Sequence, residues 1–183
     1  MKTLAVLGSF RKGEGNTSAL LDLLIEELGR QGASCENIWL PSLRMEGCRH
    51  CDWCWENAEA GRRCVIQDGM QELYPKLEGA NLLLVASPIY MWSVSAQAKA
   101  FLDRLYPYSN GGLPGKRLAA VLTSGGDPFD GMDLAVQSLQ RLANFLHMEY
   151  AGTLFAAPVL TRKDILRPEV SERVRGFAAS LLP

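Results

Sequence analysis

The hydrophobic residues of the chain fall into short, nearly continuous runs that alternate with segments of helical periodicity. Such runs are typical of strands buried on both faces of a sheet, and we expect strands at residues 3–8, 34–40, 81–87, 117–123 and 150–156. Apolar residues at helical spacing predict helices at residues 16–30, 70–77, 95–106, 132–146 and 168–182. Because strands and helices alternate, the pattern predicts an α/β fold, with a parallel sheet covered by helices on both faces.

The length of 183 residues is that of one domain, and no linker or internal repeat divides it. We therefore expect a single domain over residues 1–183, with a cysteine-rich insertion at about residues 45–66. The formal net charge of −1 argues against nucleic acid as a partner, because nucleic-acid-binding proteins carry a basic face. No apolar stretch approaches the roughly 20 residues of a membrane span, so no membrane association is predicted.

The apolar run at residues 1–8 is too short for the core of a signal peptide, and this predicts a cytoplasmic protein. In that reducing compartment the five cysteines are not expected to form disulfides. Clustered cysteines there are more typical of metal binding or catalysis.

A glycine-containing polar loop follows the first predicted strand. Ligands of doubly wound sheets bind beyond the carboxyl ends of the strands, so this loop is a candidate site. Gly13 and Gly15 allow a tight turn and a close approach of the backbone to an anion, and a helix N-cap with hydroxyl donors is expected from Asn16, Thr17 and Ser18. With Arg11 as the charged clamp, the loop suits a monophosphate such as that of FMN. The alternative is a turn and helix cap that bind nothing.

Two further loops at the same edge suit a flat, amphipathic ring. After the third strand, Tyr90 and Trp92 follow closely on a proline, and after the fourth strand Ser124, Gly125 and Gly126 offer small side chains and backbone amides. Amide groups beside the reactive ring edge are how a protein tunes a flavin. Taken singly, each loop is equally compatible with a structural role, but three such loops at one end of a sheet favour a binding site.

The most distinctive segment holds Cys48, Cys51 and Cys54, and Cys64 follows after nine intervening residues. Three thiolates at a period of three can bind three corners of an iron–sulfur cube, and a fourth ligand can come from farther along the chain. Zinc is a weaker alternative, because structural zinc sites usually pair two C-x2-C knuckles. An empty, reduced thiol loop is the third alternative. Cys35, in the second predicted strand, is expected to be a buried small hydrophobe.

The chain resembles the flavodoxin-like, NAD(P)H-dependent FMN reductase family, and especially its iron–sulfur flavoprotein branch. The resemblance rests on residues 8–17, 48–54, 87–90 and 95–104, within about the first two-thirds of the chain. It implies a flavodoxin-like three-layer sandwich with a five-stranded parallel sheet of order 2-1-3-4-5. It also implies FMN as cofactor, NAD(P)H as co-substrate, and assembly into a homodimer or homotetramer.

The resemblance assigns two groups of residues to sites. FMN would be bound by the phosphate loop and the ring loops, through Ser9, Arg11, Gly15, Asn16, Thr17, Ser18, Pro88, Ile89, Tyr90, Met91, Trp92, Ser93, Ser124, Gly125 and Gly126. A [4Fe–4S] cluster would be bound by Cys48, Cys51, Cys54 and Cys64. In the iron–sulfur branch the fourth cysteine follows about four to seven residues after the third. The longer spacing here departs from that pattern and leaves the occupant of the segment open.

These observations favour three functions. The first is an FMN-dependent oxidoreductase that takes electrons from NAD(P)H and passes them to a quinone, a nitro or azo compound, or a flavin. The second is an electron-transfer module with a [4Fe–4S] cluster, served by a ferredoxin-type protein. The third is a metal-stabilised, non-redox interaction domain. In the first two the cofactor carries the chemistry, so no side chain is predicted to act as a catalytic acid, base or nucleophile.

Overall fold

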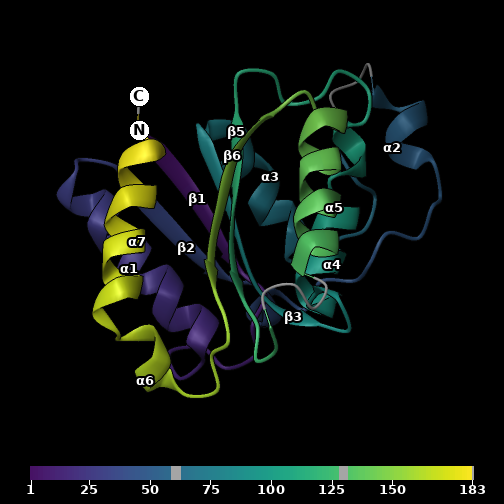
Figure 1. The fold of residues 1–183 in the computed structure, drawn as a ribbon. Coiled ribbons are helices and arrows are strands. Elements are labelled where there is room, and N and C mark those ends of the chain that lie inside the picture. The colour runs from purple at the N-terminus through teal and green to yellow at the C-terminus, as the bar shows by residue number, and fades with distance from the viewer. Residues whose placement is uncertain (59–62, 128–131, 183) are drawn as a thin grey trace.

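The structure, a computed structural model, describes residues 1–58, 63–127 and 132–182 (Figure 1). A sheet with the strand order β2-β1-β3-β5-β6 forms its centre. All neighbouring pairs along this path are parallel. The strands are β1 (Lys2–Leu7), β2 (Ser34–Trp39), β3 (Leu82–Tyr90), β5 (Arg117–Thr123) and β6 (Glu149–Ala156).

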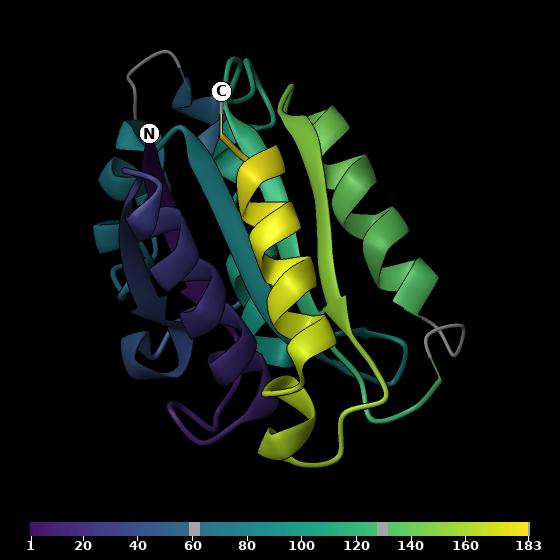
Figure 2. The same cartoon turned by 60° about the vertical axis from the view of Figure 1, so that its left-hand side comes forward.

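Helices cover both faces of this sheet, as the alternating pattern predicts (Figures 1 and 2). One face carries α1 (Asn16–Arg30), α6 (Arg162–Ile165) and α7 (Pro168–Ser180). The other face carries α3 (Met70–Gly79), α4 (Ala96–Asp103) and α5 (Met132–Phe145). The short elements η1 (Leu40–Leu43), α2 (Trp53–Glu56) and η3 (Tyr106–Tyr108) lie in the connections. The flavodoxin-like α/β sandwich is therefore confirmed.

The expected count of five strands is wrong, because a sixth strand, β4 (Ser93–Val94), pairs antiparallel with the end of β3. The order of the five parallel strands along the sheet is the expected one. In addition, β3 continues through Pro88 to Tyr90, although the sequence suggested that the proline ends it. Proline is tolerated there because the pairing of β1 with β3 ends at Ala86, so β3 is locally an edge strand on that side.

The alternating burial of strand residues divides the core into two layers. Leu4 and Val6 of β1 point to the layer under α3, α4 and α5, whereas Ala5 and Leu7 point to the layer under α1 and α7. Because both faces of β1, β3 and β5 are covered, these strands need apolar residues at successive positions, which explains their continuous hydrophobic runs. Among the described residues, no helix is both long and apolar enough to span a bilayer.

The carboxyl ends of the parallel strands meet at the edge of the sheet where α6 lies, at the bottom of Figures 1 and 2. The loops after β1, β3, β5 and β6 gather there. Helix α2 lies toward the other end of the molecule (Figure 1), and the four cysteines of the segment line a cavity at the last turn of α4. Residues 59–62 of the expected insertion lie outside the described residues. The fold thus positions two separate candidate sites.

Candidate functional site

The loop between β1 and α1 is folded tightly by its own hydrogen bonds. The Gly15 amide donates to the Arg11 carbonyl (2.9 Å), and the Gly13 amide donates to the Ser18 hydroxyl (3.0 Å). Gly13 has a φ of +72°, a conformation that side chains other than glycine rarely adopt. Ser18 is buried and shapes this turn from the inside.

The N-terminus of α1 has no side-chain cap. The sequence suggested that Asn16, Thr17 and Ser18 supply the N-cap, but the N-cap residue is Gly15. Glycine has no side chain that could accept a hydrogen bond from the first amides of the helix. Within α1, all of which is described, the first turn holds no acidic side chain. Uncapped amides and the positive end of the helix dipole favour an anion. This helix end therefore fits a phosphate group.

Three bonds tie this phosphate loop to the neighbouring connections. The hydroxyls of Thr17 and Thr123 share a buried hydrogen bond of 2.6 Å. The side-chain amide of Asn16 donates to the Val159 carbonyl (3.2 Å), and the Arg162 guanidinium donates to the Gly13 carbonyl. The loops after β1, β5 and β6 are therefore held as one unit.

The connection after β3 is a tight hairpin. Tyr90 pairs with Ser93, and the two residues between them, Met91 and Trp92, have φ values of +48° and +62°. Two successive positive φ values in a two-residue loop define a type I′ turn, whose twist suits antiparallel strands. The turn leaves Tyr90 and Met91 largely exposed at the edge of the sheet.

Ser95, at the N-cap of α4, anchors this hairpin to the phosphate loop. Its amide donates to the Ser87 hydroxyl (2.8 Å), and its own hydroxyl donates to the Gly8 carbonyl (2.6 Å). A Cβ atom at Gly8 would lie 2.8 Å from the Cβ of Ala98, so only glycine allows α4 to approach this closely. The start of α4 therefore fixes the base of both loops.

A cavity of about 210 Å³ lies where these loops meet. It brings together ten of the predicted FMN-binding residues: Ser9, Arg11, Gly15, Asn16, Thr17, Pro88, Ile89, Tyr90, Ser124 and Gly125. The other five predicted residues, Ser18, Met91, Trp92, Ser93 and Gly126, are not among the residues that line it. The lining combines hydroxyl and amide donors with a flat apolar flank, which fits a phosphorylated aromatic cofactor.

Three residues of the cavity wall, Thr123, Val159 and Leu160, were not predicted from the sequence. Val159 and Leu160 follow β6, a connection without glycines or aromatic residues to mark it as a site. These two residues could have been predicted only from their position, because β6 is parallel to β5 and ends at the same edge of the sheet. The Asn16–Val159 bond shows how directly this fourth loop contacts the phosphate loop.

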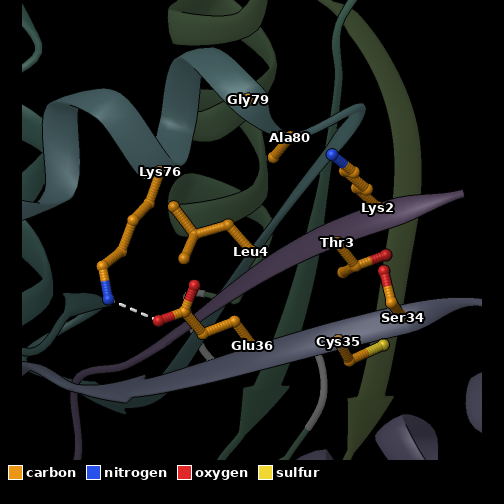
Figure 3. Close-up of a pocket in the computed structure, with 9 residues that line it drawn as sticks. All are labelled: Lys2, Thr3, Leu4, Ser34, Cys35, Glu36, Lys76, Gly79 and Ala80. Atoms are coloured by element: carbon orange, nitrogen blue, oxygen red, sulfur yellow. Dashed lines mark hydrogen bonds and ion pairs between the residues drawn. The ribbon is translucent and has the colours of Figure 1, made fainter.

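A second cavity, of about 300 Å³, opens where β1 and β2 begin (Figure 3). Lys76 pairs with Glu36 across it, and Cys35 of β2 lies half-buried in its wall. This cavity is larger than the one at the carboxyl edge. It lies at the amino ends of the strands, however, where doubly wound sheets do not bind their cofactors, and it is lined by none of the predicted site residues.

The cysteines of the insertion converge on a third, small cavity of about 20 Å³, beside η3 and the end of α4. All four predicted ligands, Cys48, Cys51, Cys54 and Cys64, line it. Burial and the nearby Cys64 raise the pKa of the Cys54 thiol. Among the described residues, no three His, Cys, Asp or Glu side chains are already arranged to hold a metal ion. Four thiols that line one cavity are the donor set that fits a sulfur-loving metal centre.

Arg104, the C-cap of α4, lies in the wall of this cysteine cavity and is 1% exposed. Its two terminal nitrogens donate to the two carboxylate oxygens of Asp68 (2.7 and 3.0 Å). They also donate to the carbonyls of Glu46 (3.0 Å) and Ile66 (3.4 Å). The third nitrogen, Nε, is buried and has no hydrogen-bond partner among the described residues.

We expect the contribution of Asp68 to stability to depend on pH. Burial would raise the pKa of this carboxyl, but the bonds from Arg104 and from the Glu46 and Met70 amides outweigh burial and lower the pKa. A carboxyl whose pKa is lowered in the folded protein stabilises the fold at any pH above its ordinary pKa, which is about 3.9 for aspartate. This stabilisation is lost as the pH falls through the pKa of the folded state. The stability difference between wild type and Asp68→Asn should therefore shrink between neutral pH and about pH 3 in urea titrations. A difference that is constant over this range would contradict the lowered pKa.

A doubly wound sheet with a phosphate loop and ring loops at its carboxyl edge defines the flavodoxin-like class of flavin-binding proteins. Within that class, the chain belongs to the NADPH-dependent FMN reductase family, whose sequence model matches residues 1–159. FMN and an oxidoreductase activity are the defining properties of this family. The family and cofactor expected from the sequence are thereby confirmed.

The chain is also similar to individual iron–sulfur flavoproteins. It is 31% identical over 141 residues to one from Methanosarcina thermophila, covering 76% of this chain and 71% of that protein. It is 37% identical over 110 residues to one from Archaeoglobus fulgidus, covering 60% of this chain and about half (48%) of that protein. In structure it is similar to an FMN-dependent NADH-azoreductase from Bacillus anthracis in complex with FMN, with a TM-score of 0.69, 17% identity and 99% of each chain covered.

Proposed function

We propose that this chain is an FMN-dependent oxidoreductase that takes electrons from NAD(P)H and passes them to a small acceptor. Quinones, nitro or azo compounds and free flavin are the acceptor classes. The observation that carries the proposal is the cavity at the carboxyl edge, where the uncapped N-terminus of α1 meets the loops after β3 and β5. The family match and the FMN-bound azoreductase of similar fold support it.

Each part of the cavity has a distinct role in this function. Arg11 and the first amides of α1 bind the phosphate, and the Thr17–Thr123 bond holds the phosphate loop against β5. Pro88, Tyr90 and the loop after β5 flank the ring. Bound FMN supplies the hydride chemistry, so the protein has to bind and orient its ligands and does not need a side-chain acid or base. The exposure of Tyr90 leaves one flank of the cavity open to a nicotinamide or an acceptor.

The test is reconstitution followed by steady-state assay. Purified protein is incubated with FMN and desalted, the retained flavin is measured by its visible spectrum, and the oxidation of NADH and of NADPH is followed with a quinone acceptor. Retained flavin with nicotinamide oxidation is the expected result. If no flavin is retained, the assignment of the cavity fails. If flavin is retained but neither nicotinamide is oxidised, the assignment of NAD(P)H as electron donor fails, and the alternative donor is a ferredoxin-type protein.

We also propose a second candidate, an iron–sulfur flavoprotein that holds a [4Fe–4S] cluster on Cys48, Cys51, Cys54 and Cys64. The favouring observation is that all four cysteines line one cavity, although the last of them is distant in sequence. The similarity to iron–sulfur flavoproteins supports it. Thiolate sulfur is the ligand type that such clusters require.

For this candidate we expect Cys51→Ala to abolish iron binding. Wild type, reconstituted anaerobically with iron and sulfide, should hold about four irons per chain, and loss of one of four thiolates should leave the cluster unstable. Cys35→Ala is the matched control, because Cys35 lies in β2 and not in the cysteine cavity. Iron and acid-labile sulfide are measured on the same samples. Equal iron in wild type and Cys51→Ala would refute the ligand assignment.

We further propose that the chain assembles into a homodimer or homotetramer in the cytoplasm. Phe10, Met91 and Leu160 are large apolar side chains with more than half of their surface exposed, and they belong to the loops at the carboxyl edge, which supports an interface there. All five cysteines are free thiols, which supports a reducing compartment. Light scattering on Met91→Lys and wild type tests the interface. A monomeric wild type would refute it.

A further inference from the structure

We propose that Arg104 is the positioning residue of the cysteine segment. It fastens both ends of residues 46–66 to α4 and offers its unpartnered Nε–H to the sulfur atoms that gather in the cysteine cavity. The second half of this inference rests on the proposed iron–sulfur function, whereas the first half does not depend on any metal.

The fastening follows from where the four donated bonds of Arg104 go. Glu46 comes two residues before Cys48, and Ile66 comes two residues after Cys64. Arg104 donates to the carbonyls of both, and so closes the segment at its two ends. Asp68 strengthens the closure, because it accepts from Arg104 on both oxygens and also from the Glu46 amide (2.9 Å). One buried side chain on a rigid helix thus defines where the segment starts and ends.

Only arginine can make this arrangement. Its planar fork donates in several fixed directions at once, whereas a lysine ammonium is a single point charge at the end of a flexible stem. The backbone at Arg104 is itself held, because the Tyr74 hydroxyl donates to the Arg104 carbonyl (3.0 Å). Burial alone would lower the pKa of Arg104, but Asp68 and the nearby Cys64 and Tyr74 raise it, so the group stays charged.

The unpartnered Nε–H indicates the second role. A buried donor without an acceptor is costly, and native structures rarely retain one. The cavity that Arg104 lines is also lined by all four cysteines, and we assign their sulfur atoms as the acceptors of this N–H. Donors that point at the sulfur atoms of a metal centre stabilise its more negative, reduced state and raise its reduction potential. Arg104 therefore has two roles: it holds the two ends of the segment, and it raises the reduction potential of the cluster that the cysteines bind.

The experiment compares wild type with Arg104→Lys in the full chain. This variant keeps a cation beside Asp68 but removes Nε–H and the fork. The matched control is Arg117→Lys, because Arg117 also pairs with a carboxylate, Glu149, and donates to the Leu181 carbonyl. Leu181 belongs to the core layer under α1 and α7, whereas the cysteine cavity lies beside α4 on the other face of the sheet. Hydrogen–deuterium exchange on the iron-free proteins reports the closure. Iron content and the reduction potential of anaerobically reconstituted samples report the sulfur contact.

In Arg104→Lys we expect the amides of residues 46–58 and 63–66 to exchange roughly tenfold faster or more, the scale of losing charge-assisted hydrogen bonds. The control should leave that segment unchanged. The reconstituted variant should hold less iron, and the remaining cluster should have a more negative potential than wild type. FMN content should be equal in all three proteins, which separates this test from that of the flavin site.

Unchanged exchange in residues 46–58 and 63–66 of Arg104→Lys would overturn the closure. Full iron content with an unchanged potential would overturn the sulfur contact. If wild type itself takes up no iron, the iron–sulfur function fails and the sulfur contact fails with it, while the exchange result still decides the closure.

Discussion

The Asp68→Ala variant should unfold with a free energy about 3–5 kcal/mol below that of wild type, the usual effect of removing one partner of a buried ion pair. Arg104 would keep its charge at 1% exposure but lose the carboxylate that accepts two of its bonds. The Glu46 and Met70 amides would lose the same acceptor. Urea denaturation at neutral pH measures the loss, provided that the m-value is unchanged.

Glu26→Ala is the control for this prediction. Glu26 pairs with Arg30 on the surface of α1, and both side chains are mostly exposed. Exposed pairs at this helical spacing contribute about 0.3–0.5 kcal/mol, so the control should be almost neutral. A double variant, Asp68→Ala with Arg104→Met, should recover part of the stability because it removes the buried charge as well. Equal losses in Asp68→Ala and Glu26→Ala would show that the buried pair does not matter.

The second large effect is expected on cofactor affinity. Replacing Arg11 with alanine should weaken FMN binding by about 1.5–3 kcal/mol, or roughly 10- to 150-fold in Kd, the range for a hydrogen bond to a charged group. The fold should survive, because the Arg11 side chain is exposed in the loop and lines the cavity. Quenching of flavin fluorescence on titration measures the Kd.

Lys12→Ala is a matched control in the same loop. The Lys12 ammonium lies over the Trp39 ring, 5.3 Å from its centre, and Lys12 does not line the cavity at the carboxyl edge. Lys12 has the same formal charge as Arg11. Comparing the two variants therefore separates direct contact of Arg11 with the phosphate from the general attraction of the anion by positive charge. A loss in Lys12→Ala as large as that in Arg11→Ala would mean that the phosphate is attracted by the loop's charge and not bound by Arg11.

The centre of the sheet was predictable because β1, β3 and β5 are buried on both faces. Residues 82–86 and 118–122 are apolar at every position for that reason, and such runs are easily found in a sequence. The loop between β1 and α1 was predictable as a turn, because its glycines lie between a strand and a helix. The N-cap of α1 was not predictable, because Gly15 offers no side chain and leaves the first amides of the helix uncapped.

The hairpin after β3 could not be predicted from local signals. A type I′ turn usually carries asparagine or glycine at its two central positions, whereas here Met91 and Trp92 adopt the positive φ values. Tertiary contacts at Ser87 and Ser95 hold these strands in place. Non-local bonds of this kind leave no periodic trace in the chain.

The convergence of the cysteines was only partly predictable. The spacing of the first three suggested a common site, but the position of Cys64 depends on the Arg104 bonds to Glu46 and Ile66. Arg104 looks ordinary in the sequence, as one cation at the end of a predicted helix. Its role depends on burial beside Asp68, 36 positions earlier in the chain, which only the folded structure reveals.

Helix α4 separates the two candidate sites by its own length. Its N-cap, Ser95, is bonded to the base of the phosphate loop, and its C-cap, Arg104, lies in the wall of the cysteine cavity. Its eight residues, at about 1.5 Å per residue, span about 12 Å. If FMN and a cluster bind as proposed, any electron that passes between them within one chain has to travel along this helix.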